Sequence, residues 1–86
     1  MPQLSRFFGI IISMYFRDHN PPHFHAKYNE YKCVIDIENL EVTEGEFPSR
    51  ALKMVLEWAA LHKDELLENW QEAQGEGNFK KIEPLK

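Results

Sequence analysis

The chain has 86 residues, which is enough for one hydrophobic core and too few for two, so we expect a single domain over residues 1–86. Apolar residues make up 43% of the sequence and charged residues 28%, values that lie near the globular average and exclude wholesale disorder. The net charge of −4 excludes a protein whose whole surface attracts nucleic acid, although RNA could still bind a local basic patch.

Cysteine content and hydropathy bear on location. Cys33 is the single cysteine, so the chain cannot form an internal disulfide bond, and a lone thiol suits a reducing compartment. The longest apolar run, residues 7–16, is too short to span a bilayer and is followed by no small-residue cleavage site. We therefore expect a cytoplasmic protein that does not associate with membranes.

The first predicted element is the run Phe7–Phe16. Its β-branched and aromatic residues, with prolines on both sides, favour one buried strand over a helix. Alternation along a strand predicts that one of its faces packs against the helices. The side chains on that face would be Phe8, Ile10, Ile12, Met14 and Phe16.

A proline-stiffened loop is predicted at Arg17–Pro22, followed by a hairpin. Its strands are His23–Tyr28 and Tyr31–Ile37, and its turn is Asn29-Glu30, because Asn tolerates the positive φ that tight turns require. Pairing the two tyrosines that flank the turn sets the register and separates two faces. The apolar face carries Phe24, Ala26, Tyr28, Tyr31, Cys33 and Ile35. The polar face carries His23, His25, Lys27, Lys32 and Asp36, so the histidines should project away from the core.

The second half of the chain is predicted to be mainly helical. A short fourth strand is expected at Leu40–Glu44, after which Pro48 suits a first helical turn and Ser49 suits an N-cap. Apolar residues then recur at three- and four-residue spacing, which predicts one kinked helix or two consecutive helices within residues 47–74. Residues 75–86 should form a tail or an edge strand. The expected fold is α+β: a small antiparallel sheet of three or four strands, drawn from residues 1–46, packed against these C-terminal helices.

Three of the four histidines lie close together, between positions 19 and 25. On a strand, His23 and His25 point to the same side, which is a spacing by which β proteins supply two imidazoles to one metal ion. His19 or Asp36 could add a third ligand. One interpretation of the cluster is therefore a site for a transition metal such as zinc, with ligands drawn from His19, His23, His25 and Asp36.

Two other interpretations need no metal. In the first, the imidazoles only hold the loop in place by hydrogen bonding its backbone and Asp36. In the second, His23 or His25 is the general acid or base of a metal-independent ribonuclease-like site. A cation would then stabilise the phosphate, and the candidates are Arg6, Arg17 and Lys27. Basic residues concentrate in residues 1–35, whereas residues 36–46 are strongly acidic, so any anion should meet the N-terminal part.

Three segments form a recognisable pattern. They are Ser5–Ile10, the block Asp18–Ala26 with the letters DHNPPHFHA, and the stretch Leu56–Trp70. In these segments the chain resembles the bacterial domain-of-unknown-function family numbered 4160, and the histidine and double-proline block is the most distinctive mark. The likeness runs from about Pro2 to Leu85. It transfers no catalytic residue to this chain.

The resemblance implies a biological setting. Proteins of this family are short bacterial chains often encoded beside another small protein, as in toxin–antitoxin or related regulatory pairs. The resemblance thus implies a partner-binding component of such a pair, with the histidine face as its functional site; a homo-oligomer is a second assembly to consider. An exposed apolar patch would hold the partner, and its candidates are Leu66, Trp70 and Phe79. The alternatives are a ribonuclease-like toxin and a histidine-ligated metal-binding protein.

Overall fold

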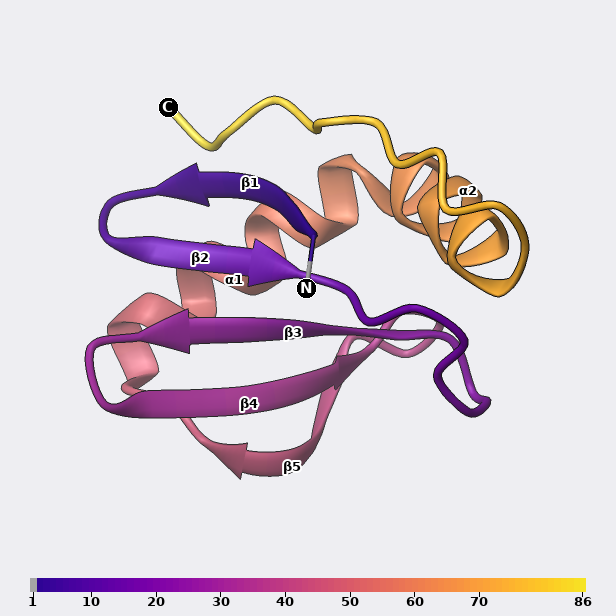
Figure 1. Cartoon of the computed structure of the whole chain (residues 1–86). Helices are drawn as coiled ribbons and strands as arrows, with labels where there is room; N and C mark the ends of the chain where they lie inside the picture. The colour runs from indigo at the N-terminus through magenta and orange to yellow at the C-terminus, as the bar shows by residue number, and fades with distance from the viewer. Residues whose placement is uncertain (1) are drawn as a thin grey trace.

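The computed structural model describes residues 2–86, which contain five strands followed by two helices (Figure 1). The elements are β1 (Gln3–Phe7), β2 (Ile10–Ser13), β3 (His23–Tyr28), β4 (Tyr31–Asp36), β5 (Glu41–Glu46), α1 (Ser49–Leu61) and α2 (Lys63–Gln74). The strands form an antiparallel sheet in the order β1-β2-β3-β4-β5. The α+β class and the two consecutive helices are confirmed, and the sheet has five strands where three or four were predicted.

The run predicted as one long strand is instead a hairpin. β1 ends at Phe7, β2 begins at Ile10, and the two residues between them have positive φ angles, 49° for Phe8 and 80° for Gly9. Two positive φ angles are typical of a type I′ turn, whose twist matches that of the flanking strands. Phenylalanine rarely adopts this conformation. The sequence has no Asn-Gly pair at this turn, so nothing in the apolar run indicated that it divides into two strands.

The apolar face predicted for this run is correct at three of its five positions. Ile10, Ile12 and Met14 are fully buried. Phe8 and Phe16 are 59% and 54% exposed, because Phe8 lies in the turn and Phe16 follows the end of β2. The predicted periodicity is thus right only within the part of the run that is a strand.

The hairpin formed by β3 and β4 has the predicted register throughout. Tyr28 pairs with Tyr31, and the ladder runs to His23 opposite Asp36. Asn29 takes the positive φ expected of it, 53°. The fourth predicted strand also exists, as β5, and begins one residue later and ends two residues later than expected.

α1 covers one face of the sheet, behind the strands in Figure 1. The Trp58 ring on α1 contacts Phe7 of β1 and Phe24 of β3, with ring centroids 5.4 and 6.0 Å apart respectively. We call the opposite face of the sheet the outer face. By register with His25 and Lys27 of β3, the outer face carries Arg6, Ile11, Ser13, His25, Lys27, Lys32 and Val34.

The helix boundaries correct one detail of the prediction. Ser49 is the first residue of α1 rather than its cap, and Pro48 occupies the N-cap position without a side-chain hydrogen bond. α1 and α2 meet at His62, which ends the first helix and precedes the second. Within residues 2–86, no helix combines the length and the apolar character needed to cross a bilayer.

Residues 75–86 form neither an edge strand nor a free tail. The segment runs beside β1 (Figure 1), where the Ile82 N–H donates a hydrogen bond to the Leu4 carbonyl at 2.9 Å. The Trp58 indole N–H donates to the Glu83 carbonyl at 2.7 Å, and the Ile82 side chain is buried. The tail therefore closes the open end of the core between β1 and the helices.

Two residues proposed for an exposed partner-binding patch lie in the core instead. Leu66 is fully buried and Trp70 is 5% exposed. Phe79 is partly buried, and its ring packs against Phe16 at a centroid distance of 5.1 Å. Leu66 and Trp70 are four residues apart on α2 and so lie on the same side of the helix, the side that faces the core.

Candidate metal centre

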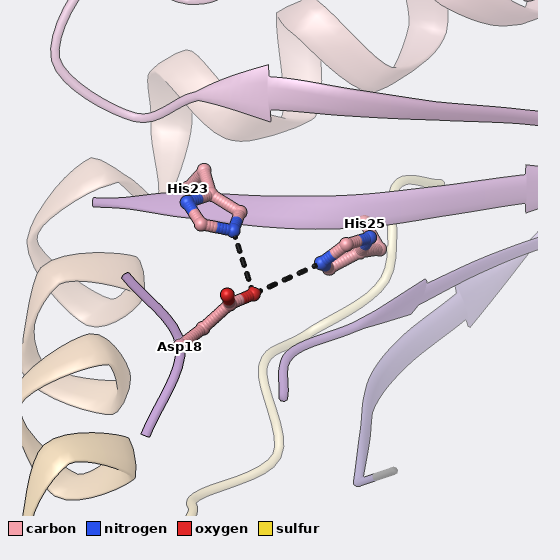
Figure 2. Close-up of side chains that lie close together, drawn as sticks. All are labelled: Asp18, His23 and His25. Carbon is pink, nitrogen blue, oxygen red and sulfur yellow. Dashed lines mark hydrogen bonds and ion pairs between the residues drawn. The ribbon is translucent and has the colours of Figure 1, made fainter. Parts of the chain in front are cut away.

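The loop between β2 and β3 is anchored at both ends, and this anchoring positions Asp18. At one end, the Arg17 N–H donates to the Ala73 carbonyl of α2 at 2.9 Å, with Arg17 itself at a φ of 51°. At the other end, the Ile37 N–H donates to the Pro22 carbonyl at 3.0 Å. The loop consequently folds back, and Asp18 lies against the start of β3 (Figure 2).

Asp18, His23 and His25 point toward one another (Figure 2). Asp18 Oδ2 lies 2.8 Å from His23 Nε2 and 3.5 Å from His25 Nε2. One ligand atom from each residue falls within 4.8 Å of the other two. We call these three residues the triad. Its two imidazoles share the outer face of β3 because they are two residues apart.

His23 makes two hydrogen bonds that together constrain its protonation. Its Nδ1 lies 2.7 Å from the Pro21 carbonyl oxygen, which can only accept, so Nδ1 must carry a hydrogen. A neutral ring then presents a lone pair at Nε2 to the Asp18 carboxylate, 2.8 Å away. That contact is favourable only if a cation is shared there, either a proton on Nε2 or a metal ion. His23 is also held in place by Trp70 of α2, at a ring-centroid distance of 5.0 Å.

His25 is the more weakly paired histidine of the triad. Its Nε2 is buried, and its partner is Asp18 Oδ2 at 3.5 Å, a contact too long and poorly aligned to be a well-formed hydrogen bond. The Tyr15 ring meets the imidazole edge-on at 4.3 Å. Desolvation lowers the pKa of His25 below the ordinary histidine value and outweighs the raising effect of Asp18. The ring is therefore neutral near pH 7, which is the form that coordinates metals.

Asp18 is the complementary anion. Burial by itself would raise its pKa, but hydrogen bonds from the His23 ring and from the His19 backbone N–H lower the pKa below the ordinary carboxyl value. The carboxylate is thus ionised and directed at two imidazoles. A carboxylate between two imidazole rings is a typical ligand set for a divalent cation.

The spacing of the ligand atoms suits coordination to a single ion. Metal–nitrogen and metal–oxygen bonds of about 2.1 Å at roughly 90 to 110° place neighbouring ligand atoms roughly 3.0 to 3.4 Å apart. The observed nitrogen–oxygen separations of 2.8 and 3.5 Å bracket this range, and the two imidazole nitrogens lie within 4.8 Å of each other. Three protein ligands leave coordination positions open for water or substrate, as in catalytic rather than structural sites.

The remaining predicted site residues lie outside the triad. His19 is exposed, its side chain 83% accessible, with Nδ1 3.0 Å from Asp18 Oδ1. Asp36 accepts hydrogen bonds from the Glu38 N–H at 3.0 Å and from Asn39 Nδ2 at 2.9 Å, so both of its oxygens serve the turn after β4. Two predicted basic residues, Arg17 and Lys27, are exposed beside the site, Arg17 in the anchored loop and Lys27 on β3.

Asp18 was not among the ligands expected from the sequence, and neither was the contact of Tyr15 with His25. The available signal was an acidic residue five positions before His23 within a proline-stiffened loop. Sequence spacing favoured the alternating residues of the hairpin instead. The return of the loop depends on Ala73, which is 55 positions after Asp18 and carries no local signal.

One family comparison gives a match. The model of a family described as Domain of unknown function (DUF4160) matches residues 9–71, which include the whole triad. No curated protein and no solved structure matches the chain significantly. The description of the family names no activity.

Proposed function

This chain belongs to the family described as Domain of unknown function (DUF4160), and from the geometry of its site we propose that it binds a divalent transition-metal ion through Asp18, His23 and His25. The observation that carries the proposal is the convergence of one carboxylate oxygen and two imidazole nitrogens within 4.8 Å. The weak pairing of His25 Nε2 supports it, because this buried nitrogen has only a 3.5 Å contact with Asp18 Oδ2, and an imperfectly satisfied buried nitrogen is costly unless something binds it.

The ligand set favours particular ions. Two imidazoles and one carboxylate suit Zn(II) and Fe(II), whereas an all-oxygen set would be needed to favour magnesium or calcium. Open coordination positions would allow the ion to polarise a bound water or a substrate oxygen. We therefore propose a catalytic rather than a structural role for the ion. The alternative is a metal-independent ribonuclease-like toxin. In that case His25 would act as the general base, and the activity would persist in the presence of a chelator.

The first test is metal binding by untagged protein. We expect the purified wild-type chain to take up one Zn(II) or Fe(II) ion, measured by elemental analysis and by calorimetric titration of the apoprotein. His25→Ala and Asp18→Asn should each weaken binding roughly tenfold or more, because each removes a ligand. Because these variants bind the ion weakly, the ion should no longer raise their melting temperature.

The matched control is His19→Ala, which removes an exposed imidazole next to Asp18 without touching the triad. It should bind metal like the wild type. Far-UV circular dichroism of every variant separates loss of a ligand from loss of the fold. Absence of stoichiometric metal in folded wild-type protein, or equal binding by His25→Ala, would contradict the proposal.

We further propose that the chain is a partner-binding component of a bacterial gene pair in the cytosol, of the toxin–antitoxin or regulatory kind. The support is a pair of exposed aromatic residues beside the triad. Tyr15 and Phe16 are 44% and 54% exposed and lie in the loop after β2. Exposed aromatic residues are common anchors of protein interfaces. They replace Leu66 and Trp70 as the candidates for the patch.

A further inference from the structure

Two neighbouring pockets lie on the outer face of the sheet next to the triad, and we call them together the groove. One part of it is a pocket of about 260 Å³ lined by Tyr15, His25, Lys27 and Lys32, among others. A second part, of about 210 Å³, is lined by His19 and His23. The two parts share Val34 and Glu44. Each imidazole of the triad therefore borders one of two neighbouring pockets.

A pair of like charges lies at one end of this groove. Lys27 on β3 is directly opposite Lys32 on β4, and both side chains are exposed. Like charges in directly opposed cross-strand positions destabilise a sheet. Within residues 2–86, no ion pair involves either lysine, although Glu46 is opposite Lys32 on β5. Through Ile11, Arg6 of β1 lies in the same cross-strand row. This row of basic side chains would be stabilised by a bound anion.

We propose that the groove binds a phosphate ester, with the phosphoryl oxygens on Lys27 and Lys32 and the apolar part of the ligand against Tyr15 and Val34. The phosphate ester would be the substrate of the metal site, and this assignment as substrate rests on the proposed function. Lysine is a common phosphate ligand, and a phosphoryl dianion between two ammonium groups would offset their repulsion.

The dimensions and charges of the groove support this orientation of the ligand. A pocket of about 260 Å³ is slightly smaller than typical small-molecule sites, which suits one phosphoryl group attached to a single ring or sugar. Lys27 is two residues from His25, a distance of roughly 7 Å along the strand, so the ligand would reach from the lysines to the ion. Glu44 lies in the same cross-strand row as Val34 and His25 and disfavours an anion there, which directs the phosphoryl group to the row of Lys27 and Lys32.

Two sources could supply this chemistry, namely a free nucleotide and a single nucleic-acid strand. Both carry a phosphate ester next to an aromatic base, and Tyr15, which is 44% exposed, could stack on such a base. The probes are therefore adenosine monophosphate and a short oligothymidylate, with inorganic phosphate as the minimal anion. Tighter binding of the mononucleotide would identify the first source, and tighter binding of the oligonucleotide the second.

The experiment measures binding of each probe to the Zn(II)-loaded protein by calorimetry. Lys27→Gln and Lys32→Gln should each weaken binding of the better organic probe by roughly tenfold, because each removes a charge-assisted contact. Lys53→Gln is the matched control, since Lys53 is exposed on α1, which lies behind the opposite face of the sheet. It should change the affinity by less than about twofold.

The outcomes separate this inference from the proposed function, because metal content is measured in the same samples. Normal metal content with equal affinity in the Lys27, Lys32 and Lys53 variants would overturn the anion site and leave the metal site standing. Absence of metal would overturn the metal site, and the comparison of lysine variants would then be made on the apoprotein. Failure of all three probes to bind the wild type overturns the inference.

Discussion

At the scale of single residues, the site depends on hydrogen bonds that limit where protons can be. The hydrogen bond from His23 Nδ1 to the Pro21 carbonyl orients the ring so that its Nε2 points at Asp18. Because desolvation favours the neutral form of His25, whose Nε2 makes only a weak contact with Asp18 at 3.5 Å, this nitrogen can bind a cation. The two neighbouring histidines thus contribute differently, one oriented by a backbone carbonyl and one by burial against Tyr15.

Cys33 supplies a prediction at the same scale. Its side chain is 3% exposed, and burial raises the pKa of the thiol to about 11 from an ordinary value of 9.0. At mildly alkaline pH the thiolate fraction should be roughly a hundredfold lower than for an exposed thiol. We expect iodoacetamide to modify the native protein at least that much more slowly than the urea-unfolded protein.

The same pKa shift affects stability at high pH. The unfolded thiol ionises first, so the contribution of Cys33 to the free energy of unfolding is present below pH 9 and declines between about pH 9 and pH 11. Cys33→Ser is no control, because it buries a hydroxyl group; Cys33→Ala keeps the site apolar and should remove this part of the pH dependence.

In the alkylation experiment with iodoacetamide, equal rates in native and unfolded protein would show that Cys33 is accessible.

At the scale of elements, turns explain which parts of the sheet were predictable. The β3–β4 hairpin was predicted with its full register because Asn29 marks the turn and the residues on either side alternate in polarity. The β1–β2 hairpin was missed because Phe8 has a positive φ in the middle of an apolar run. Strand periodicity was therefore informative only where the turn chemistry was also recognisable.

Gly45 is the position in β5 where a side chain cannot fit. It has a φ of 84°, and a Cβ atom there would lie 2.2 Å from the Lys32 carbonyl oxygen. Gly45→Ala should lower the free energy of unfolding by roughly 2 kcal/mol or more, because it adds a backbone clash to an unfavourable φ. Urea denaturation measures the change. Glu46→Ala, at an exposed neighbouring position, should shift it by less than about 0.5 kcal/mol, and an equally stable Gly45 variant would count against this geometry of β5.

At the scale of the whole molecule, residues far apart in sequence build the site together. α2 positions the triad twice, since Ala73 anchors the loop that carries Asp18 and Trp70 packs on the His23 ring. The C-terminal tail contributes indirectly, because Phe79 packs on Phe16 at the start of the same loop. The site therefore requires the sheet, the second helix and the tail to be assembled.

The exposed aromatic residues lead to a prediction about assembly. Co-expression with the product of the adjacent gene should give a stable complex, detected by size-exclusion chromatography with light scattering. Tyr15→Ser combined with Phe16→Ser should weaken that complex, because the pair is the apolar surface beside the site. Thr43→Ser, on the exposed strand β5, is the control. Two independent species would refute the partner-binding role, and the light-scattering mass of the chain alone tests for a homo-oligomer.

The sequence by itself predicted three strands from residue 23 followed by helical structure within residues 47–74, the register of the β3–β4 hairpin, and the placement of His23 and His25 on one side of a strand. These features follow from local periodicity and turn chemistry, which depend on neighbouring residues. Only the tertiary structure decided that Asp18 belongs to the triad, because a hydrogen bond to α2 folds its loop back. The tertiary structure also excluded Asp36 from the triad, because local hydrogen bonds occupy its carboxylate oxygens. Ligands separated by a loop converge through long-range contacts, which no local spacing encodes.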